Sequence, residues 1–165
     1  MKFLKTSCLI LIFLTGCSNQ KRIELAIEME IQKQLNKCVY AVSTKNIDEY
    51  MALLPIDFVI YDQNGEVISR EQQRAYTLRD WAIIDATLSN VYKVDSIRAY
   101  GDSVIAYTSQ RWERLMFQRD GKTKDTVLTT QKHLETWKKT PVGWLNYDVK
   151  ELGGEIFING KLYAE

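Results

Sequence analysis

The chain has 165 residues, of which 22 are basic and 21 are acidic, and its formal net charge is +1. Hydrophobic residues make up 45% of it, and this length suits one domain with a sizeable core. A chain without a basic excess has neither the electrostatic footprint of a nucleic-acid-binding protein nor a polybasic segment for an anionic membrane surface. The composition therefore excludes nucleic acid as an expected partner.

The N-terminus has the pattern of a secretory signal at residues 1–16. Two lysines precede an apolar run from Cys8 to Leu14, and small residues follow up to Cys17. The run is far shorter than the roughly 20 residues that a transmembrane helix needs. Leu14-Thr15-Gly16-Cys17 resembles the lipobox of bacterial lipoproteins, in which the signal is removed before a cysteine that then carries lipid. We expect lipidated Cys17, followed by a polar tether over residues 17–22.

Lipidation predicts a cell-envelope protein, and Ser18 after the cysteine favours the outer membrane, facing the periplasm. The alternative is an ordinary cleaved signal that leaves Cys17 as a free thiol. Cleavage removes two lysines, so 20 basic residues face 21 acidic ones in the mature chain. Residues 23–165 form the predicted single domain. Cys38 is its one cysteine, lies on an apolar helical stripe and is expected to be a small buried hydrophobe.

The domain contains no pattern for a metal or a cofactor. With one histidine and no paired cysteines in it, a metal site is not expected. The sequence also lacks a Gly-rich phosphate loop, a P-loop and a serine nucleophile elbow. We therefore expect no cofactor.

Three helices are predicted in the N-terminal half. Apolar residues from Ile23 to Val42 recur at helical spacing without Gly or Pro, which indicates a long amphipathic helix. Asn46, three residues before a glutamate, caps a short second helix that Pro55 ends. Ser69, three residues before a glutamine, caps a third helix that runs toward Trp81.

Strands surround and follow the third helix. The stretch DFVIYDQNGEVIS predicts a hairpin around Asn64-Gly65. Turns at Gly101-Asp102, Asp120-Gly121 and residues 140–143 then separate long β-prone segments, which indicates an antiparallel meander. The predicted segments are Thr87 to Tyr100, Ser103 to Arg119, Thr123 to Lys138 and Trp144 to Glu151. A further Asn159-Gly160 turn predicts a small terminal hairpin or flap.

This order of elements resembles the SnoaL-like, nuclear-transport-factor-like superfamily. Two stretches carry the resemblance: KNIDEYMALLPIDFVIYDQNGEVISREQ matches its second helix, first hairpin and third-helix start, and ETWKKTPVGWLNYDV matches its final hairpin. The resemblance implies an α+β fold in which three N-terminal helices pack on a curved, mostly antiparallel sheet and form a cone with a pocket. Members include isomerases, dehydratases, polyketide cyclases and oligomerisation modules, so the fold alone does not specify a function.

The family's known active sites do not transfer to this chain. The scytalone dehydratase type uses more than one histidine, whereas this chain has only His133. The ketosteroid isomerase type pairs a tyrosine of the first helix with a carboxylate near the first hairpin. Tyr40 and Asp62 are the nearest equivalents, although Asp62 also suits the polar flank of a turn.

The two hairpin turns predict a strand register. Two-residue turns would place Thr108 between Asp95 and His133, and Ala106 opposite Glu135. Since side chains alternate between faces, one face then carries a polar set bounded by tryptophans: Asp95, Thr108, Gln110, Trp112, Gln131, His133, Glu135 and Trp137. The other face carries mainly apolar residues: Leu88, Tyr92, Val94, Ile105, Tyr107, Leu115 and Leu134.

The resemblance implies that the polar face lines the cone, because in related kinase association domains the residue two before the final tryptophan, here Glu135, points inward. A small, partly apolar ligand is then expected to bind among Thr108, Gln110, Trp112, Gln131, His133, Glu135 and Trp137. In the alternative, an acid/base enzyme, His133 is the catalytic base or acid and Asp95 or Glu135 orients it.

Two further interpretations remain open. His133 can be a hydrogen-bonded structural residue, and the tryptophans can be packing residues. The domain can also be an interaction module whose pocket is incidental. The apolar face, which no helix is left to cover, predicts a homodimer through the convex side of the sheet.

Overall fold

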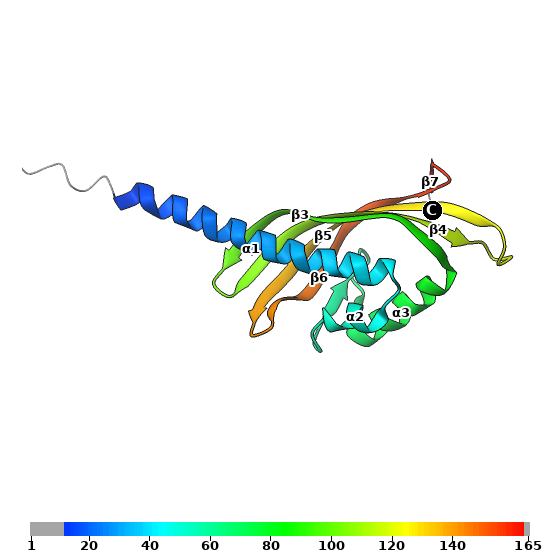
Figure 1. The fold of residues 1–165 in the computed structure, drawn as a ribbon, viewed down its shortest axis with the longest axis horizontal. Coiled ribbons are helices and arrows are strands. Elements are labelled where there is room, and N and C mark those ends of the chain that lie inside the picture. The colour runs from blue at the N-terminus through cyan, green and yellow to red at the C-terminus, as the bar shows by residue number, and fades with distance from the viewer. Residues whose placement is uncertain (1–11, 164–165) are drawn as a thin grey trace, which may run out of the picture.

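The computed structural model describes residues 12 to 163, and the side chains from residue 20 onward. It has three helices, α1 (Ile12–Ser43), α2 (Ile47–Ala52) and α3 (Arg70–Ile83) (Figure 1). The described strands are β1 (Val59–Tyr61), β2 (Val67–Ser69), β3 (Ile84–Tyr100), β4 (Ser103–Phe117), β5 (Lys124–Thr140), β6 (Gly143–Ile158) and β7 (Lys161–Leu162). Most of the predicted signal peptide, and the side chain of Cys17, lie outside the described residues.

Helix α1 packs its apolar stripe against the sheet. Ile31 and Leu35 are fully buried in the main core with Val104 and Trp137, and Ile27 packs beside them. The N-terminal part of the helix extends past the end of the sheet (Figure 1). Residues 18–22 continue this helix instead of forming a separate tether, because nothing in their sequence breaks it. No helix in the described part of the chain is long and apolar enough to cross a membrane.

The predicted helix caps are confirmed. The side chain of Asn46 accepts a hydrogen bond from the Glu49 N–H at 3.2 Å, which starts α2. Ser69 and Gln72 form a reciprocal capping box at the start of α3. Arg70 then donates to the carbonyls of Leu54 and Met51, at 3.1 and 2.9 Å, and thereby joins α3 to the end of α2.

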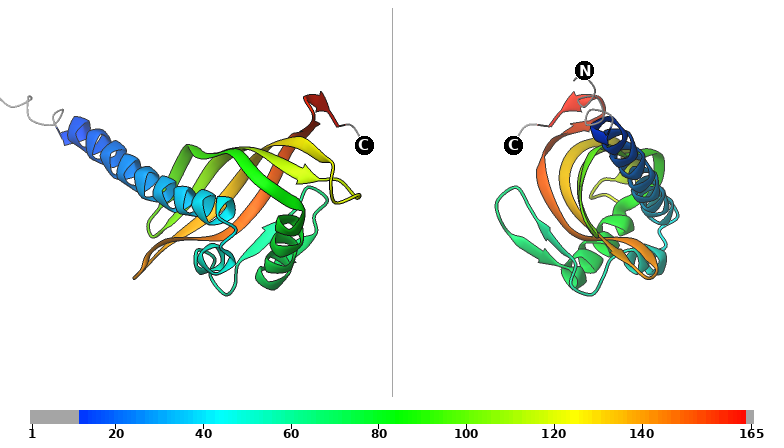
Figure 2. Two further views of the ribbon diagram at one scale, coloured as in Figure 1. Left: turned by 45° about the vertical axis from the view of Figure 1, so that its right-hand side comes forward. Right: turned by 90° about the vertical axis from the view of Figure 1, so that its left-hand side faces the viewer.

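The strands form one mixed, seven-stranded sheet. Its order is β2-β1-β6-β5-β4-β3, with β7 paired to β6. Neighbours are antiparallel except for β1 and β6, which run parallel. The sheet curves around the helices (Figure 2). The expected α+β class, with N-terminal helices packed on a mostly antiparallel sheet, is therefore confirmed.

The predicted register between β4 and β5 is correct. Thr108 pairs with His133, Ala106 with Glu135 and Gln110 with Gln131. The last strand is longer than predicted, since β6 continues past Glu151 and turns at Asn159-Gly160 to pair with β7. Gly154 permits this continuation, because a Cβ there would lie 1.9 Å from the Thr130 carbonyl oxygen.

The predicted register between β3 and β4 is correct from Ser96 to Tyr100 and wrong for the residues that precede Ser96. Val94 pairs with Thr108 and Ser96 with Tyr107, so Asp95 is an additional residue in a β-bulge. The bulge reverses the alternation of side chains that a regular strand would have. Asp95 consequently lies exposed, where it accepts a hydrogen bond from Ser109 at 3.0 Å. Tyr92 and Val94, predicted on the convex face, pack against the core instead.

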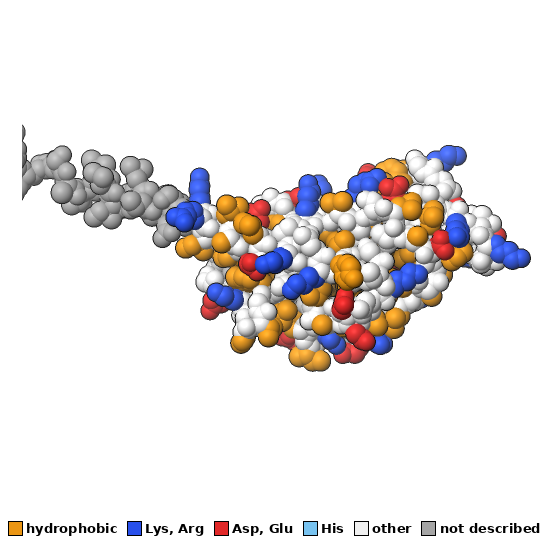
Figure 3. Space-filling view, viewed as in Figure 1, with side chains coloured by type: hydrophobic (Ala, Val, Ile, Leu, Met, Phe, Trp, Pro, Cys, Tyr) orange, Lys and Arg blue, Asp and Glu red, His pale blue; other side chains and the backbone are white. Residues whose placement is uncertain are grey.

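Charged side chains of both signs are interspersed with apolar ones on the helix-bearing face (Figure 3). The distribution agrees with the near-neutral net charge of the chain. We therefore expect no extended region of positive or negative electrostatic potential on this face.

Candidate functional site

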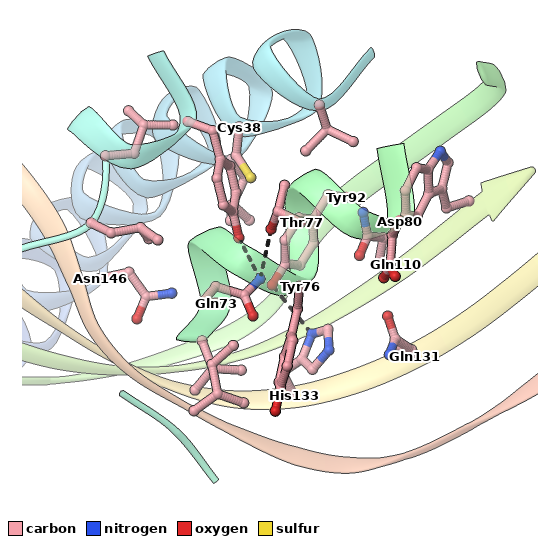
Figure 4. Close-up of a pocket in the computed structure, with 18 of the residues that line it drawn as sticks. Cys38, Gln73, Tyr76, Thr77, Asp80, Tyr92, Gln110, Gln131, His133 and Asn146 are labelled. Atoms are coloured by element: carbon pink, nitrogen blue, oxygen red, sulfur yellow. Dashed lines mark hydrogen bonds between the residues drawn. The ribbon is translucent and has the colours of Figure 1, made fainter. Parts of the chain in front are cut away.

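A cavity of about 450 Å³ lies between the helices and the inner face of the sheet. Apolar walls come mainly from α1, α2, α3 and the first hairpin, and include Leu35, Leu53, Phe58, Ile60, Ile68 and Trp81. The sheet contributes the polar side chains Gln110, Gln131, His133 and Asn146 (Figure 4). A volume of this size falls within the range of pockets for small molecules.

Glu135 is fully buried beneath the polar side of this cavity, at 0% exposure. Its carboxylate accepts four hydrogen bonds. Tyr92 and Thr108 donate their hydroxyls to Oε1, the latter at 2.8 Å. Trp137 Nε1 and Asn146 Nδ2 donate to Oε2, at 2.7 and 3.2 Å. Each oxygen thus has two donors, which is the arrangement that a buried carboxylate needs.

The pKa values of this cluster reflect burial. Burial raises the pKa of Glu135, and the hydrogen bonds from Tyr92, Thr108 and Trp137 oppose that rise by favouring the charged form. Burial, followed by the neighbouring Glu135 charge, raises the pKa of Tyr92 well above its ordinary value. Tyr92 therefore keeps its proton and acts as a donor to the carboxylate.

His133 lines the cavity and contacts the same tyrosine. Its Nδ1 lies 3.2 Å from the Tyr92 hydroxyl oxygen, and the two rings meet edge to face with centroids 5.7 Å apart. Since the one proton of Tyr92 goes to Glu135, Nδ1 must carry the proton of the His133–Tyr92 contact. Burial lowers the pKa of His133 to about 4, so the ring is neutral near pH 7 and Nε2 is an acceptor.

Asn146 is the second oriented group. Its Nδ2 donates to Glu135, and its Oδ1 is buried without a hydrogen-bond partner among the described residues. A flipped amide would bring two oxygens together, so Glu135 fixes the orientation. An unpaired buried acceptor costs roughly 1–3 kcal/mol. Because Oδ1 is inaccessible as well as unpaired, Nε2 of His133 is the acceptor of this cluster that faces the cavity.

A cation lies elsewhere in the cavity wall. The Arg114 guanidinium is 4.2 Å from the Trp112 ring centroid, and Nη1 donates to Thr129 Oγ1 at 2.9 Å. Burial lowers the pKa of Arg114 and the nearby Asp80 opposes this shift. Asp80 also lines the cavity, so the positive charge here has an acidic neighbour.

Most of the predicted ligand-binding residues line the cavity. Gln110, Trp112, Gln131, His133 and Trp137 do so. Thr108 and Glu135 lie just behind the cavity wall, as the buried hydroxyl and carboxylate of the cluster.

The assignment of Asp95 to the site is wrong, because the bulge turns it to the outer surface. Tyr92 and Asn146 are not among the predicted site residues. Asn146 could have been predicted, because the hairpin that turns at residues 140–143 pairs it with Trp137. Tyr92 could not, because nothing in the sequence marks the bulge that turns it inward. Tyr50, Gln73 and Thr77 enter from the helices, where sequence does not define the packing angle.

Cys38 also lines the cavity, and burial raises its thiol pKa to about 12. A thiol with this pKa is an unreactive apolar side chain near neutral pH. Within the described residues, no group of three or more His, Cys, Asp or Glu side chains is arranged to hold a metal ion.

Neither a family model nor a curated protein matches the sequence. The structure is similar to that of an NTF2-like protein from Cytophaga hutchinsonii, at 19% identity and TM-score 0.58, over 73% of this chain and 93% of that one. It also resembles an NTF2-like superfamily protein from Salmonella enterica (18% identity, TM-score 0.59, 78% and 91% covered). A third similar structure is a ketosteroid isomerase-like protein from Erwinia carotovora (10%, 0.56, 76% and 96%). At these identities the likeness shows the fold.

Proposed function

We propose that this chain, which has the NTF2-like fold, binds a small, partly apolar molecule in its cavity. The observation that carries this proposal is a cavity of about 450 Å³ with apolar helical walls and an oriented acceptor, Nε2 of His133, whose ring is held through Tyr92 by buried Glu135. Apolar walls with a few oriented polar groups are the usual construction of a small-molecule site.

The chemistry of the polar groups favours binding over proton transfer. A general base works best when its pKa lies near the working pH, and burial moves the pKa of His133 in the opposite direction, to about 4. Stabilising an enolate would require donors directed at the ligand oxygen. The oriented atom that His133 offers, Nε2, is an acceptor.

The binding proposal is tested with tryptophan fluorescence and a neutral apolar probe, N-phenyl-1-naphthylamine. Trp81, Trp112 and Trp137 line the cavity, whereas Trp144 packs in the core under α1. A Trp144→Phe protein should therefore show saturable quenching like the wild type, and Trp112→Phe should reduce its amplitude. Failure of this probe and of a broad set of other small apolar compounds to quench would refute the proposal.

A second candidate, an acid/base enzyme, is favoured by the chain of contacts from His133 through Tyr92 to Glu135. This chain would hold Nε2 of His133 unprotonated toward a substrate, as the orienting carboxylate of other acid/base sites does. In this role the protein should accelerate exchange of the α-hydrogens of an enolisable ketone in D₂O, measured by NMR. Tyr92→Phe should then slow the exchange by tenfold or more. Equal rates with and without protein would reject this candidate.

We further propose that the protein is anchored in the cell envelope by lipid on Cys17, in the outer membrane facing the periplasm. The lipobox-like sequence from Leu14 to Cys17 supports the attachment site, and Ser18 supports the sorting. In this arrangement the continuous helix α1 would hold the domain away from the bilayer as a spacer. Between Cys17 and Ile27, its first core contact, it would rise about 15 Å.

A homodimer through the convex face of the sheet is the proposed assembly. Leu88 and Tyr107 on strands β3 and β4 are 52% and 45% exposed, and Val91 on β3 is also exposed. Exposed apolar side chains that cluster on one face commonly mark an interface. This dimer would leave the cavity free, because the cavity lies on the opposite side of the sheet.

A further inference from the structure

We infer that the ligand presents a hydrogen-bond donor, such as a hydroxyl, to His133 Nε2, and that an anionic head group is excluded from this end of the cavity. The inference rests on the proposed binding function and adds the chemical class of the ligand. It follows from the direction of every hydrogen bond around one buried carboxylate.

Asn146 belongs to the buried cluster and does not offer an acceptor to the ligand. Its amide nitrogen donates to Glu135 at 3.2 Å, and its Oδ1 is buried as well as unpaired among the described residues. A ligand in the cavity therefore does not reach Oδ1.

His133 offers the acceptor. Tyr92 gives its proton to Glu135, so it can only accept from the imidazole, and Nδ1 carries the imidazole proton. This tautomer leaves Nε2 with a free lone pair in a residue that lines the cavity. Figure 4 shows His133 and Asn146 on the sheet side of the cavity, across from the helical residues Cys38 and Thr77. His133 therefore lies where a ligand that fills the cavity would meet the sheet.

The hydrogen bonds at this end also disfavour an anion. Nδ1 of His133 donates to Tyr92, and Tyr92 donates to Glu135, so neither donor is free for a ligand. A carboxylate or phosphate here would bring its own lone pairs against the lone pair of Nε2, with no donor between them. Two arginines line other parts of the wall: Arg114 stacks on Trp112 and bonds Thr129, and Arg79 pairs with Asp80. A neutral donor is thus the head group that suits this end.

Two matched series of compounds test the inference with full-length protein. The first is 4-phenylphenol, 4-methoxybiphenyl and biphenyl-4-carboxylate, and the second is 2-naphthol, 2-methoxynaphthalene and 2-naphthoate. We expect each phenol to bind roughly tenfold more tightly than its methyl ether in calorimetric titrations, since only the phenol can donate. The carboxylates should bind more weakly than the ethers.

Variants and one spectroscopic measurement complete the test. His133→Phe should bring the phenol and ether affinities severalfold closer, and the control Thr136→Val, on the outer face of the same strand, should not. Because the chain has one histidine, the ¹⁵N signal of Nε2 is unique and should shift with the phenol and not with the ether. This measurement needs no variant.

The outcomes separate the inference from the function on which it rests. Equal affinities for phenol and ether, or preferred binding of the carboxylate, would overturn the donor inference and leave ligand binding intact. An Nε2 signal that does not move with bound phenol would overturn it as well. Failure of all six compounds to bind would contradict the proposed binding function itself.

Discussion

Replacement of Glu135 by leucine should destabilise the protein strongly, although leucine is apolar and of similar size. The carboxylate is the common acceptor for Tyr92, Thr108, Trp137 and Asn146, and leucine would leave these buried donors without it. The two hydroxyls can turn to other acceptors, but the Trp137 indole cannot. Each unpaired buried donor costs roughly 1–3 kcal/mol, and removal of the buried charge recovers part of this cost. We expect a net loss of about 3–5 kcal/mol.

Glutamine at the same position provides the matched comparison. Its oxygen can still accept from Trp137 and Asn146, and its amide can donate to the hydroxyl oxygens of Tyr92 and Thr108. We therefore expect Glu135→Gln to lose only about 1–2 kcal/mol, because the bonds are kept but are no longer charge-assisted. The exposed Glu155 serves as the control, where leucine should change stability by less than about 0.5 kcal/mol.

Urea unfolding followed by circular dichroism measures these differences. We expect the wild type to have the highest free energy of unfolding, Glu135→Gln an intermediate value and Glu135→Leu the lowest, with unchanged m-values. A leucine variant as stable as the wild type would refute the reasoning. It would mean that the four donors do not compensate the desolvation of the carboxylate and that the cluster is a net burden on the fold.

Three further predictions concern other parts of the chain. The pKa of His133 is lowered to about 4 in the folded state, below its ordinary value of 6.5, so the unfolded chain binds more protons between these values. Stability should therefore fall by about 3 kcal/mol as the pH drops from 6.5 to 4, and a His133→Phe protein should lack this slope. Cys17→Ser should abolish incorporation of a radiolabelled fatty acid, and label retained by the variant would contradict lipidation. Lysine at Tyr107 and Leu134 should produce monomers in sedimentation, whereas a wild type that is already monomeric at high concentration would exclude the dimer.

The part of the site on β4 and β5 could be predicted from the sequence because two local signals fix it. The turns at Gly101-Asp102 and Asp120-Gly121 set the register, and the period of two along a strand sets the faces. This prediction holds even though the second turn is longer than two residues, since β4 ends at Phe117 and β5 begins at Lys124. A loop centred on the predicted residues leaves the pairing unchanged.

The other parts of the site depend on information that no local pattern contains. A β-bulge adds one residue without a distinctive sequence, so the alternation along β3 gives the wrong face on one side of it. The contribution of Tyr50, Gln73 and Thr77 depends on the angles at which short helices dock on the sheet. The caps of α2 and α3 are predicted correctly, although α1 begins before the predicted Ile23. Docking, in contrast, is decided by packing across the whole domain.

The bulge at Asp95 also explains why a single buried carboxylate is tolerated behind the cavity. In a regular strand, Asp95 would lie beside Thr108 and place a second carboxyl group near Glu135, and the two charges would repel one another. The bulge removes this acid to the surface and turns Tyr92 inward, where its hydroxyl donates to Glu135. An anionic neighbour is thereby replaced by a donor. The same exchange fixes the proton of His133 on Nδ1, so the hydrogen-bonding character of the cavity follows from one additional residue in β3.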